Sequence, residues 1–131
     1  MSPLAPVNLV ITTGEPAGIG PEVSLRAALA FLAEQENVSI TLLGDVSLFA
    51  IPQQVSPSVL ARLKLETIPL RGPVQAGVLN PANAEYVVNL LDLAIDACMQ
   101  KRFDAMVTAP VQKSVINQAG LAFTGHTEYL A

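Results

Sequence analysis

Short runs of apolar and β-branched residues alternate along the chain with stretches in which apolar residues recur every three or four positions. Val7 to Thr12 is a β-rich run followed by a segment rich in glycine and proline, which predicts a buried strand ending in a tight loop. Apolar residues at helical spacing, with a proline in the first turn, predict a helix over residues 21–35. Val38 to Leu43 is nearly all apolar or β-branched, as in a strand covered on both faces. Together the three elements predict a βαβ unit.

The alternation returns after a weaker central region that several prolines interrupt. Within that region we expect a short helix over residues 47–50 and a strand over 65–69. Asn80 and Pro81 are a good N-cap and first helical residue, and the apolar stripe after them predicts a helix to about Lys101. The remaining predicted elements are a strand over 103–108, a helix over 111–119 and a loop over 121–131. The class is therefore expected to be α/β, with a mostly parallel sheet and helices on both faces.

Composition excludes several classes of function and partner for such a fold. With 131 residues, 51% of them hydrophobic, the chain can bury one sizeable core, so we expect residues 1–131 to form one domain. Only 14% of residues are charged and the net charge is -4, which argues against nucleic acid as a partner. The single cysteine, Cys98, cannot form an internal disulfide. Neither a signal peptide nor a run of about 18 apolar residues is present, so a soluble, cytoplasmic protein is expected.

A glycine-rich segment, Gly14 to Glu22, lies between the first predicted strand and its helix. Glycines permit close backbone approach and a helix N-terminus attracts anions, so Gly18 and Gly20 are candidate contacts for a phosphate or cofactor. As a dinucleotide-binding fingerprint the segment is incomplete, because the third glycine would fall at Val23. In that interpretation Asp45 would bind the ribose. The local sequence favours the alternative, a tight turn with Asp45 capping the residues that follow.

Two more segments carry candidate chemistry. Thr108 ends a predicted strand and Lys113 lies one turn into the next helix, so the pair could hold a phosphate or carboxylate. Thr108 could equally be an N-cap, with Lys113 solvated. The only histidine, His126, follows a glycine, and its imidazole can donate to a phosphate or hydroxyl, while Thr127 can cap a helix. All three segments are expected at the carboxyl edge of the sheet, where α/β proteins bind ligands.

Four motifs in this order and spacing resemble the N-terminal signatures of 4-hydroxythreonine-4-phosphate dehydrogenases. They are GEPAGIGPE at 14–22, TAPVQK at 108–113, INQAG at 116–120 and FTGHTE at 123–128. The resemblance implies the N-terminal portion of a longer two-domain enzyme, with a fold like that of isocitrate and isopropylmalate dehydrogenases and an active site at a homodimer interface. It also implies that His126 and Thr127 bind substrate, and it overrides the ribose-binding role for Asp45.

By the same resemblance, the whole enzyme oxidises 4-phosphooxy-L-threonine with NAD or NADP. The product, a 3-oxo acid, loses carbon dioxide on the way to pyridoxal 5'-phosphate. A divalent metal (zinc, magnesium or cobalt) polarises the reacting hydroxyl. The family's metal ligands are histidines downstream of the FTGHTE motif, and this chain holds one histidine in all. We therefore expect no metal site within residues 1–131, no activity from this chain alone, and exposed apolar surface where a missing domain would pack.

Two other functions share these features. A dehydrogenase of threonate or erythronate 4-phosphate would carry the same motifs, because His126 and Thr127 would contact a group common to both kinds of substrate. A non-enzymatic module could instead bind phosphate ligands through the helix starts near Gly18 and Thr108. Phosphate binding that survives His126→Ala would favour the binding module.

Overall fold

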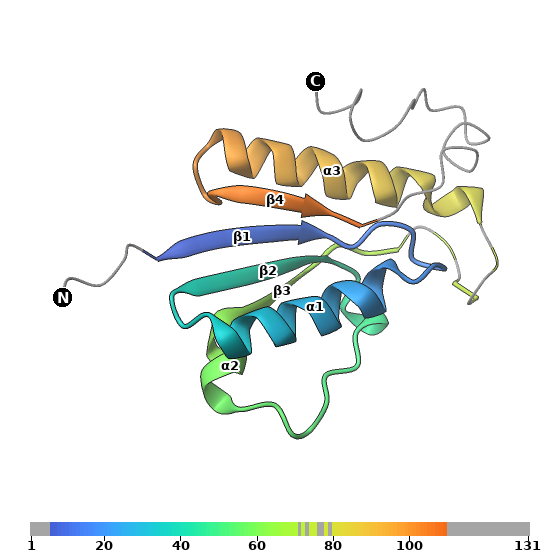
Figure 1. The fold of residues 1–131 in the computed structure, drawn as a ribbon. Coiled ribbons are helices and arrows are strands. Elements are labelled where there is room, and N and C mark those ends of the chain that lie inside the picture. Colours follow the sequence, from blue (N-terminus) through green and yellow to red (C-terminus); the bar gives the residue numbers. More distant parts are fainter. Residues whose placement is uncertain (1–5, 71, 73, 76–77, 79, 110–131) are drawn as a thin grey trace.

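The computed structural model describes residues 6–70, 72, 74–75, 78 and 80–109, which form a four-stranded parallel sheet with helices on both faces (Figure 1). The strand order is β3-β2-β1-β4. The strands are β1 Val7–Thr12, β2 Val38–Gly44, β3 Leu63–Thr67 and β4 Ala105–Thr108. The α-helices are α1 Gly20–Glu34, α2 Pro57–Arg62 and α3 Ala84–Met99, and the 3-10 helices are η1 Val46–Leu48 and η2 Pro81–Asn83.

Adjacent residues of β1 point to opposite faces of the sheet and belong to two separate cores. Val10 packs with α3 side chains such as Leu90 in one cluster, whereas Ile11 packs with α1 side chains such as Leu32 in the other. Because both faces are covered, the carboxyl halves of the central strands β1 and β2 are buried throughout, whereas the edge strand β3 alternates apolar with polar residues. The predicted α/β class, with helices on both faces of a parallel sheet, is confirmed.

The first βαβ unit follows the predicted boundaries closely. β1 spans the predicted residues, α1 begins at Gly20 and β2 ends at Gly44, each within a residue of expectation. β1 and β2 pair in parallel with Val7 opposite Val38. The alternation of a strand, a helix and a strand was therefore enough to predict this half of the fold.

The central region differs from the prediction in three ways. The helix expected over 47–50 is a 3-10 turn over Val46–Leu48, because the Asp45 side chain accepts a hydrogen bond from the Ser47 N–H at 2.9 Å. Helix α2 was not predicted, although the Ser56 side chain caps it by accepting from the Val59 N–H at 3.3 Å. The strand expected over 65–69 is displaced to Leu63–Thr67, directly after α2.

The long helix after Asn80 begins with a 3-10 turn and ends two residues early. Asn80 accepts from the Ala82 N–H at 3.0 Å, as an N-cap does, and α3 proper begins at Ala84. Lys101 has a φ of 64°, which reverses the chain after the helix. β4 begins at Ala105 rather than 103, and the predicted helix over 111–119 and loop over 121–131 lie outside the described residues.

Two expectations from composition concern Cys98 and membrane spans. Cys98 is half-buried against the core on the α3 side, and burial raises the pKa of its thiol. Among the residues that the structure describes, no helix has both the length and the apolar character needed to cross a bilayer.

Candidate functional site

The carboxyl ends of β1, β2 and β4 lie side by side at one edge of the sheet. Thr12 is opposite Leu43 in one neighbouring strand and Thr108 in the other. From β1 the chain crosses to β2, and from β3 it returns in the opposite direction to β4, so the crossovers change direction between β1 and β4. Open α/β sheets bind ligands at this kind of switch point.

Gly20 lies where α1 starts against the end of β1. A Cβ built on Gly20 would lie 2.2 Å from the Thr13 carbonyl oxygen and 3.3 Å from the Ala109 Cβ. The Ala109 N–H in turn donates to the Thr12 carbonyl at 2.9 Å. The structure therefore brings Gly20 together with the residue after Thr108, and glycine is needed at position 20 for this close approach.

The loop between β1 and α1 encloses a carboxyl group. Glu15 is 5% exposed, and its Oε1 accepts from the Ala17 N–H at 3.2 Å. Its carbonyl accepts from the Gly18 N–H at 3.1 Å, which closes a tight turn. Burial raises the pKa of the Glu15 carboxyl, and the hydrogen bond from Ala17 offsets part of this rise. The site thus contains a carboxyl group that holds its proton to higher pH than an exposed one.

We expect Glu15→Gln to stabilise the chain at neutral pH and to have little effect under acid conditions. Because the folded-state pKa lies above the ordinary value of 4.5, the charged form costs more in the folded state. Stability from this group is therefore fully present below that value and is lost as pH rises through the folded-state pKa. Thermal unfolding of both proteins across this range measures the effect. A constant difference at every pH would contradict it.

A network of hydroxyls joins β1, β2 and α3 beneath this loop. The Thr13 hydroxyl donates to the Leu43 carbonyl at 2.8 Å, and the Tyr86 hydroxyl accepts from the Asp45 N–H at 2.9 Å. The two hydroxyls also share a hydrogen bond, and burial raises the pKa of Tyr86. A Cβ on Gly44 would lie 2.5 Å from the Thr13 Oγ1, so the network requires glycine there. The edge of the sheet is consequently rigid and polar.

The carboxylate oxygens of Asp45 accept hydrogen bonds from neighbouring parts of the chain. Its Oδ1 accepts from the Ser47 hydroxyl at 2.7 Å and the Ser47 N–H at 2.9 Å, and its Oδ2 accepts from the Leu70 N–H at 3.1 Å. These bonds, that from the Ser47 side chain first, lower the pKa of the carboxyl. The structure agrees with the capping role that the local sequence favours.

Thr12 and Thr108 are neighbours at the switch point. They are register partners in β1 and β4, so their side chains leave the same face of the sheet. Thr12 is 1% exposed, and within the described part of the chain its Oγ1 has no hydrogen-bond partner. Buried hydroxyls are usually paired, so this atom is the unexplained polar group of the site.

The remaining predicted site residues fall beyond the described chain. Lys113, His126 and Thr127 all lie in residues 110–131, so the structure does not place them. Within the described ranges there is no group of three or more histidine, cysteine, aspartate or glutamate side chains that could hold a metal ion. Of the candidates, Gly18, Gly20 and Thr108 are the ones that the structure locates at the carboxyl edge.

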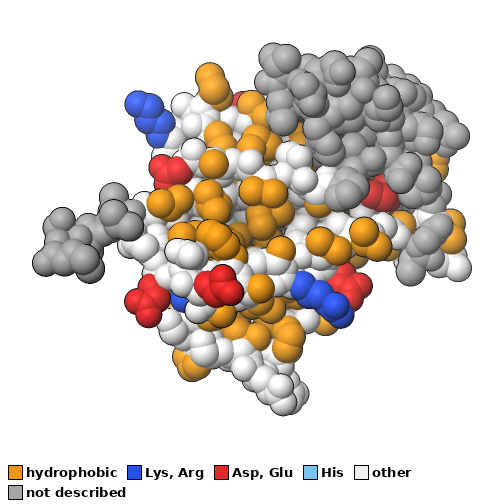
Figure 2. Space-filling view, in the orientation of Figure 1, with side chains coloured by type: hydrophobic (Ala, Val, Ile, Leu, Met, Phe, Trp, Pro, Cys, Tyr) orange, Lys and Arg blue, Asp and Glu red, His pale blue; other side chains and the backbone are white. Residues whose placement is uncertain are grey.

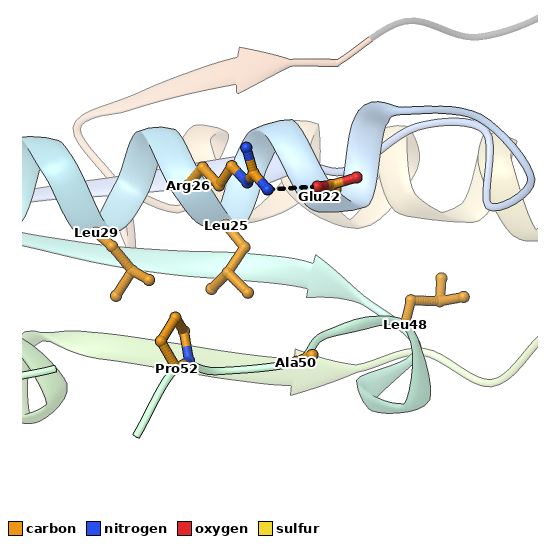
Figure 3. A pocket seen from close by; sticks show the side chains of 7 residues that line it. All are labelled: Glu22, Leu25, Arg26, Leu29, Leu48, Ala50 and Pro52. Carbon is orange, nitrogen blue, oxygen red and sulfur yellow. Dashed lines mark ion pairs between the residues drawn. The ribbon is translucent and has the colours of Figure 1, made fainter. Parts of the chain in front are cut away.

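A pocket of about 400 Å³ lies beside the first half of α1. Leu25 and Leu29 point from α1 toward Pro52, and the Glu22–Arg26 ion pair, 2.8 Å long, stands on its rim (Figure 3). Both charged side chains are exposed, so the pair adds little stability. Of the predicted site residues that the structure describes, Gly18, Gly20 and Thr108, none lines this pocket.

Sequence reasoning missed the buried polar groups of the site. Glu15 lies inside the glycine-rich motif, and a charged residue among small residues was the available signal. Tyr86 lies one turn into the predicted helix, where periodicity can indicate burial but not the partner of a hydroxyl. Thr12 is the last residue of a predicted strand, and that position does not indicate the environment of its hydroxyl.

The chain matches the family model described as pyridoxal phosphate biosynthetic protein PdxA over residues 16–131. It belongs to the PdxA family. Curated relatives from this family include a 4-hydroxythreonine-4-phosphate dehydrogenase of Chromobacterium violaceum, 49% identical over 98% of this chain and 42% of the relative. One from Ralstonia nicotianae is 46% identical over 95% of this chain and 41% of the relative. The chain therefore spans about two fifths of the length of these PdxA relatives.

Solved structures agree on the fold. A 4-hydroxythreonine-4-phosphate dehydrogenase from Burkholderia phymatum superposes with a TM-score of 0.76 at 21% identity, covering 97% of this chain and 43% of that structure. One from Klebsiella pneumoniae gives 0.73 at 23% identity, covering 95% of this chain and 44% of that structure. The chain therefore shares its α/β fold with these solved structures, as the predicted fold class requires.

Proposed function

We propose that the chain is the N-terminal α/β portion of a 4-hydroxythreonine-4-phosphate dehydrogenase. The observation that carries the proposal is the match to the PdxA family over residues 16–131, together with a 4-hydroxythreonine-4-phosphate dehydrogenase that is 49% identical to this chain. The reaction is the oxidation of 4-phosphooxy-L-threonine by NAD or NADP to a 3-oxo acid that decarboxylates, a step in pyridoxal 5'-phosphate synthesis. The full-length protein is a homodimer in this proposal.

This portion supplies substrate and anion contacts. His126 and Thr127 bind the phosphorylated substrate, and Thr108 with Lys113 contacts an anionic group of the substrate or cofactor. Support comes from the position of Thr108 beside Thr12 at the switch point of the sheet. The α1 N-terminus has no side-chain cap in the described chain, so its backbone N–H groups near Gly18 and Gly20 suit an anion.

The divalent metal belongs to the rest of the enzyme. When bound, it supplies Lewis-acid polarisation of the reacting oxygen. The donor set of the described residues does not fit such an ion, because no three ligating side chains converge there. The contribution of the described residues is a rigid edge, held by the Tyr86 and Thr13 hydroxyls, on which a ligand is oriented.

The test compares this chain with a chimera that adds the downstream part of the Chromobacterium violaceum relative. We expect NAD reduction with 4-phosphooxy-L-threonine and a divalent cation from the chimera and none from the chain alone. His126→Ala in the chimera should lower kcat/KM by about a hundredfold, because a contact to the phosphorylated substrate is lost. Met99→Ala, an exposed change on the far end of α3, is the control.

The outcomes separate the three functions. Turnover by the chain alone would contradict the requirement for the downstream part. Faster turnover of threonate or erythronate 4-phosphate by the chimera would assign the related dehydrogenase. Phosphate binding by the chain that is unaffected by His126→Ala, without turnover in the chimera, would favour the binding module.

A further inference from the structure

The hydroxyl of Thr12 is buried in apolar surroundings without a hydrogen-bond partner in the described part of the chain. Thr12 is 1% exposed, and its Oγ1 is fully covered. On the same face of the sheet, Val10 in β1 and Leu43, its register partner in β2, belong to the core that packs against α3. A buried hydroxyl that lacks a partner loses its hydration without compensation. Valine, which has nearly the same shape, would avoid this cost.

The next residue along the chain is a threonine whose hydroxyl is paired. Thr13 is 0% exposed, and its hydroxyl donates to the Leu43 carbonyl at 2.8 Å and shares a second hydrogen bond with the Tyr86 hydroxyl. The fold therefore uses the hydroxyl of Thr13, whereas nothing in the described chain uses that of Thr12. Residues that lower stability without local compensation are characteristic of functional sites.

Thr12 lies at the carboxyl edge of the sheet, at the boundary between the core and the surface. It is the last residue of β1, and its register partner Thr108, at the end of β4, is half-buried. A threonine side chain has three staggered χ1 rotamers, and one step between them exchanges the positions of its hydroxyl and methyl groups. The Thr12 hydroxyl can therefore turn toward an oxygen bound beside Thr108 without a movement of the backbone.

The start of α1 lies close to both threonines. A Cβ on Gly20, the first residue of α1, would lie 2.2 Å from the Thr13 carbonyl oxygen and 3.3 Å from the Ala109 Cβ, so Gly20 contacts the residues that follow Thr12 and Thr108. The first N–H groups of a helix have no partner within the helix, and α1 has no side-chain cap in the described chain. Hydroxyl and N–H donors are thus available at one edge.

Two hollows elsewhere on the described molecule lack such a group. Hydrophobic side chains gather in the middle of the face shown in Figure 2, and the groove between α1 and β4 is lined by apolar residues alone, among them Phe31 and Val107. In the pocket beside α1, the charged lining residues are Glu22 and Arg26, which pair with each other. The unpartnered hydroxyl distinguishes the carboxyl edge, where a ligand would gain a hydrogen bond with Thr12.

We propose that the Thr12 hydroxyl donates a hydrogen bond to a phosphate oxygen of a ligand bound at the carboxyl edge, either the phosphorylated substrate or the dinucleotide. Phosphate oxygens are strong acceptors, and both ligands carry them. The inference rests on the proposed function for the identity of these ligands. The bond gained on binding offsets the cost of the unpaired hydroxyl and fixes the ligand relative to the sheet.

Thr12→Val and Thr13→Val, the same change at neighbouring buried positions, test the proposal in the chain alone. We expect Thr12→Val to raise the midpoint of thermal unfolding by about 3 °C, because it removes an unpaired hydroxyl. Thr13→Val should lower the midpoint, because it removes the donor to the Leu43 carbonyl and the partner of the Tyr86 hydroxyl. Circular dichroism measures both. A fall in both variants would show that the Thr12 hydroxyl has a structural partner and would overturn the proposal.

Activity is measured in the chimera with the Chromobacterium violaceum downstream part. We expect Thr12→Val to lower kcat/KM about tenfold and Thr12→Ser, which keeps the hydroxyl, to retain most of it. A rise in KM for 4-phosphooxy-L-threonine alone assigns the bond to the substrate, and a rise in KM for NAD alone assigns it to the dinucleotide. Wild-type turnover by Thr12→Val would overturn this inference and leave the proposed function intact.

If the chimera does not turn over, the proposed function fails and ligand binding still tests the role of Thr12. Either 4-phosphooxy-L-threonine or NAD should raise the midpoint of thermal unfolding of the chimera, by less in Thr12→Val than in Thr12→Ser. Equal rises in the two variants, or no rise with either compound, would overturn the inference as well.

Discussion

Gly20→Ala lowers the free energy of unfolding of this chain by about 3 kcal/mol, whereas Gly18→Ala changes it by less than about 0.5 kcal/mol. The new methyl at position 20 would lie 2.2 Å from the Thr13 carbonyl oxygen, a contact that real Cβ atoms do not make. Thr13 is 0% exposed and fixed by its bond to Leu43, so the strand end cannot yield without disturbing the sheet. A methyl on Gly18 meets its nearest atom, the Glu15 carbonyl oxygen, at an ordinary 3.5 Å.

Urea unfolding of the wild type and the two variants measures the difference. Because both substitutions add one methyl within the same loop and helix start, Gly18→Ala is a matched control for changes in unfolded-state entropy. Equal losses at the two positions would contradict the close approach of α1 to β1. If the chimera turns over substrate, a loss of turnover by Gly18→Ala without a loss of stability would place a ligand against Gly18.

The first half of the fold was predictable because its signals are local. β1, α1 and β2 are continuous apolar or periodic segments separated by glycine, and the parallel pairing of β1 with β2 follows from the helix between them. The central region was less predictable, since α2 is six residues long and shows no full helical repeat. Its Ser56-Pro57 start was the signal available, and a cap alone does not distinguish a helix from a turn.

After α3 the sequence pattern predicts a strand that begins before the observed strand β4. Phe103 is buried and apolar like a strand residue, yet it packs in the α3 core before β4 begins at Ala105. Arg102 donates its N–H to the Ala97 carbonyl at 2.8 Å, so the helix C-terminus still holds the chain there. Burial was therefore correctly predicted at Phe103, while the backbone conformation depended on hydrogen bonds that hydrophobicity does not report.

The candidate site was predictable in position but not in detail. Glycine and threonine motifs after strands indicated the carboxyl edge, and the structure places Gly20 and Thr108 there. The contacts between these motifs join residues about a hundred positions apart, as in the bond from the Ala109 N–H to the Thr12 carbonyl. Such pairs depend on strand order, and the sequence pattern specifies strand order only weakly.

Tyr86→Ala lowers the free energy of unfolding by about 4 kcal/mol, and Tyr86→Phe lowers it by about 1.5 kcal/mol. Tyr86 is 0% exposed and packs from the first turn of α3 against the end of β2. Alanine leaves a cavity and removes the hydroxyl, whereas phenylalanine fills the space and leaves the Asp45 N–H without the acceptor that it has at 2.9 Å. The smaller change therefore isolates the contribution of the Tyr86 hydroxyl, which bonds to both the Asp45 N–H and the Thr13 hydroxyl.

Equilibrium unfolding of both variants, with Leu93→Ala as a control, measures these losses. Leu93 lies on the same helix but is 46% exposed, so its truncation should cost less than about 1 kcal/mol. If Tyr86→Phe were as stable as the wild type, the hydroxyl network would not hold the edge of the sheet. If instead Phe and Ala were equally destabilising, the hydroxyl rather than the ring would carry the stability, and the edge would be maintained by hydrogen bonds more than by packing.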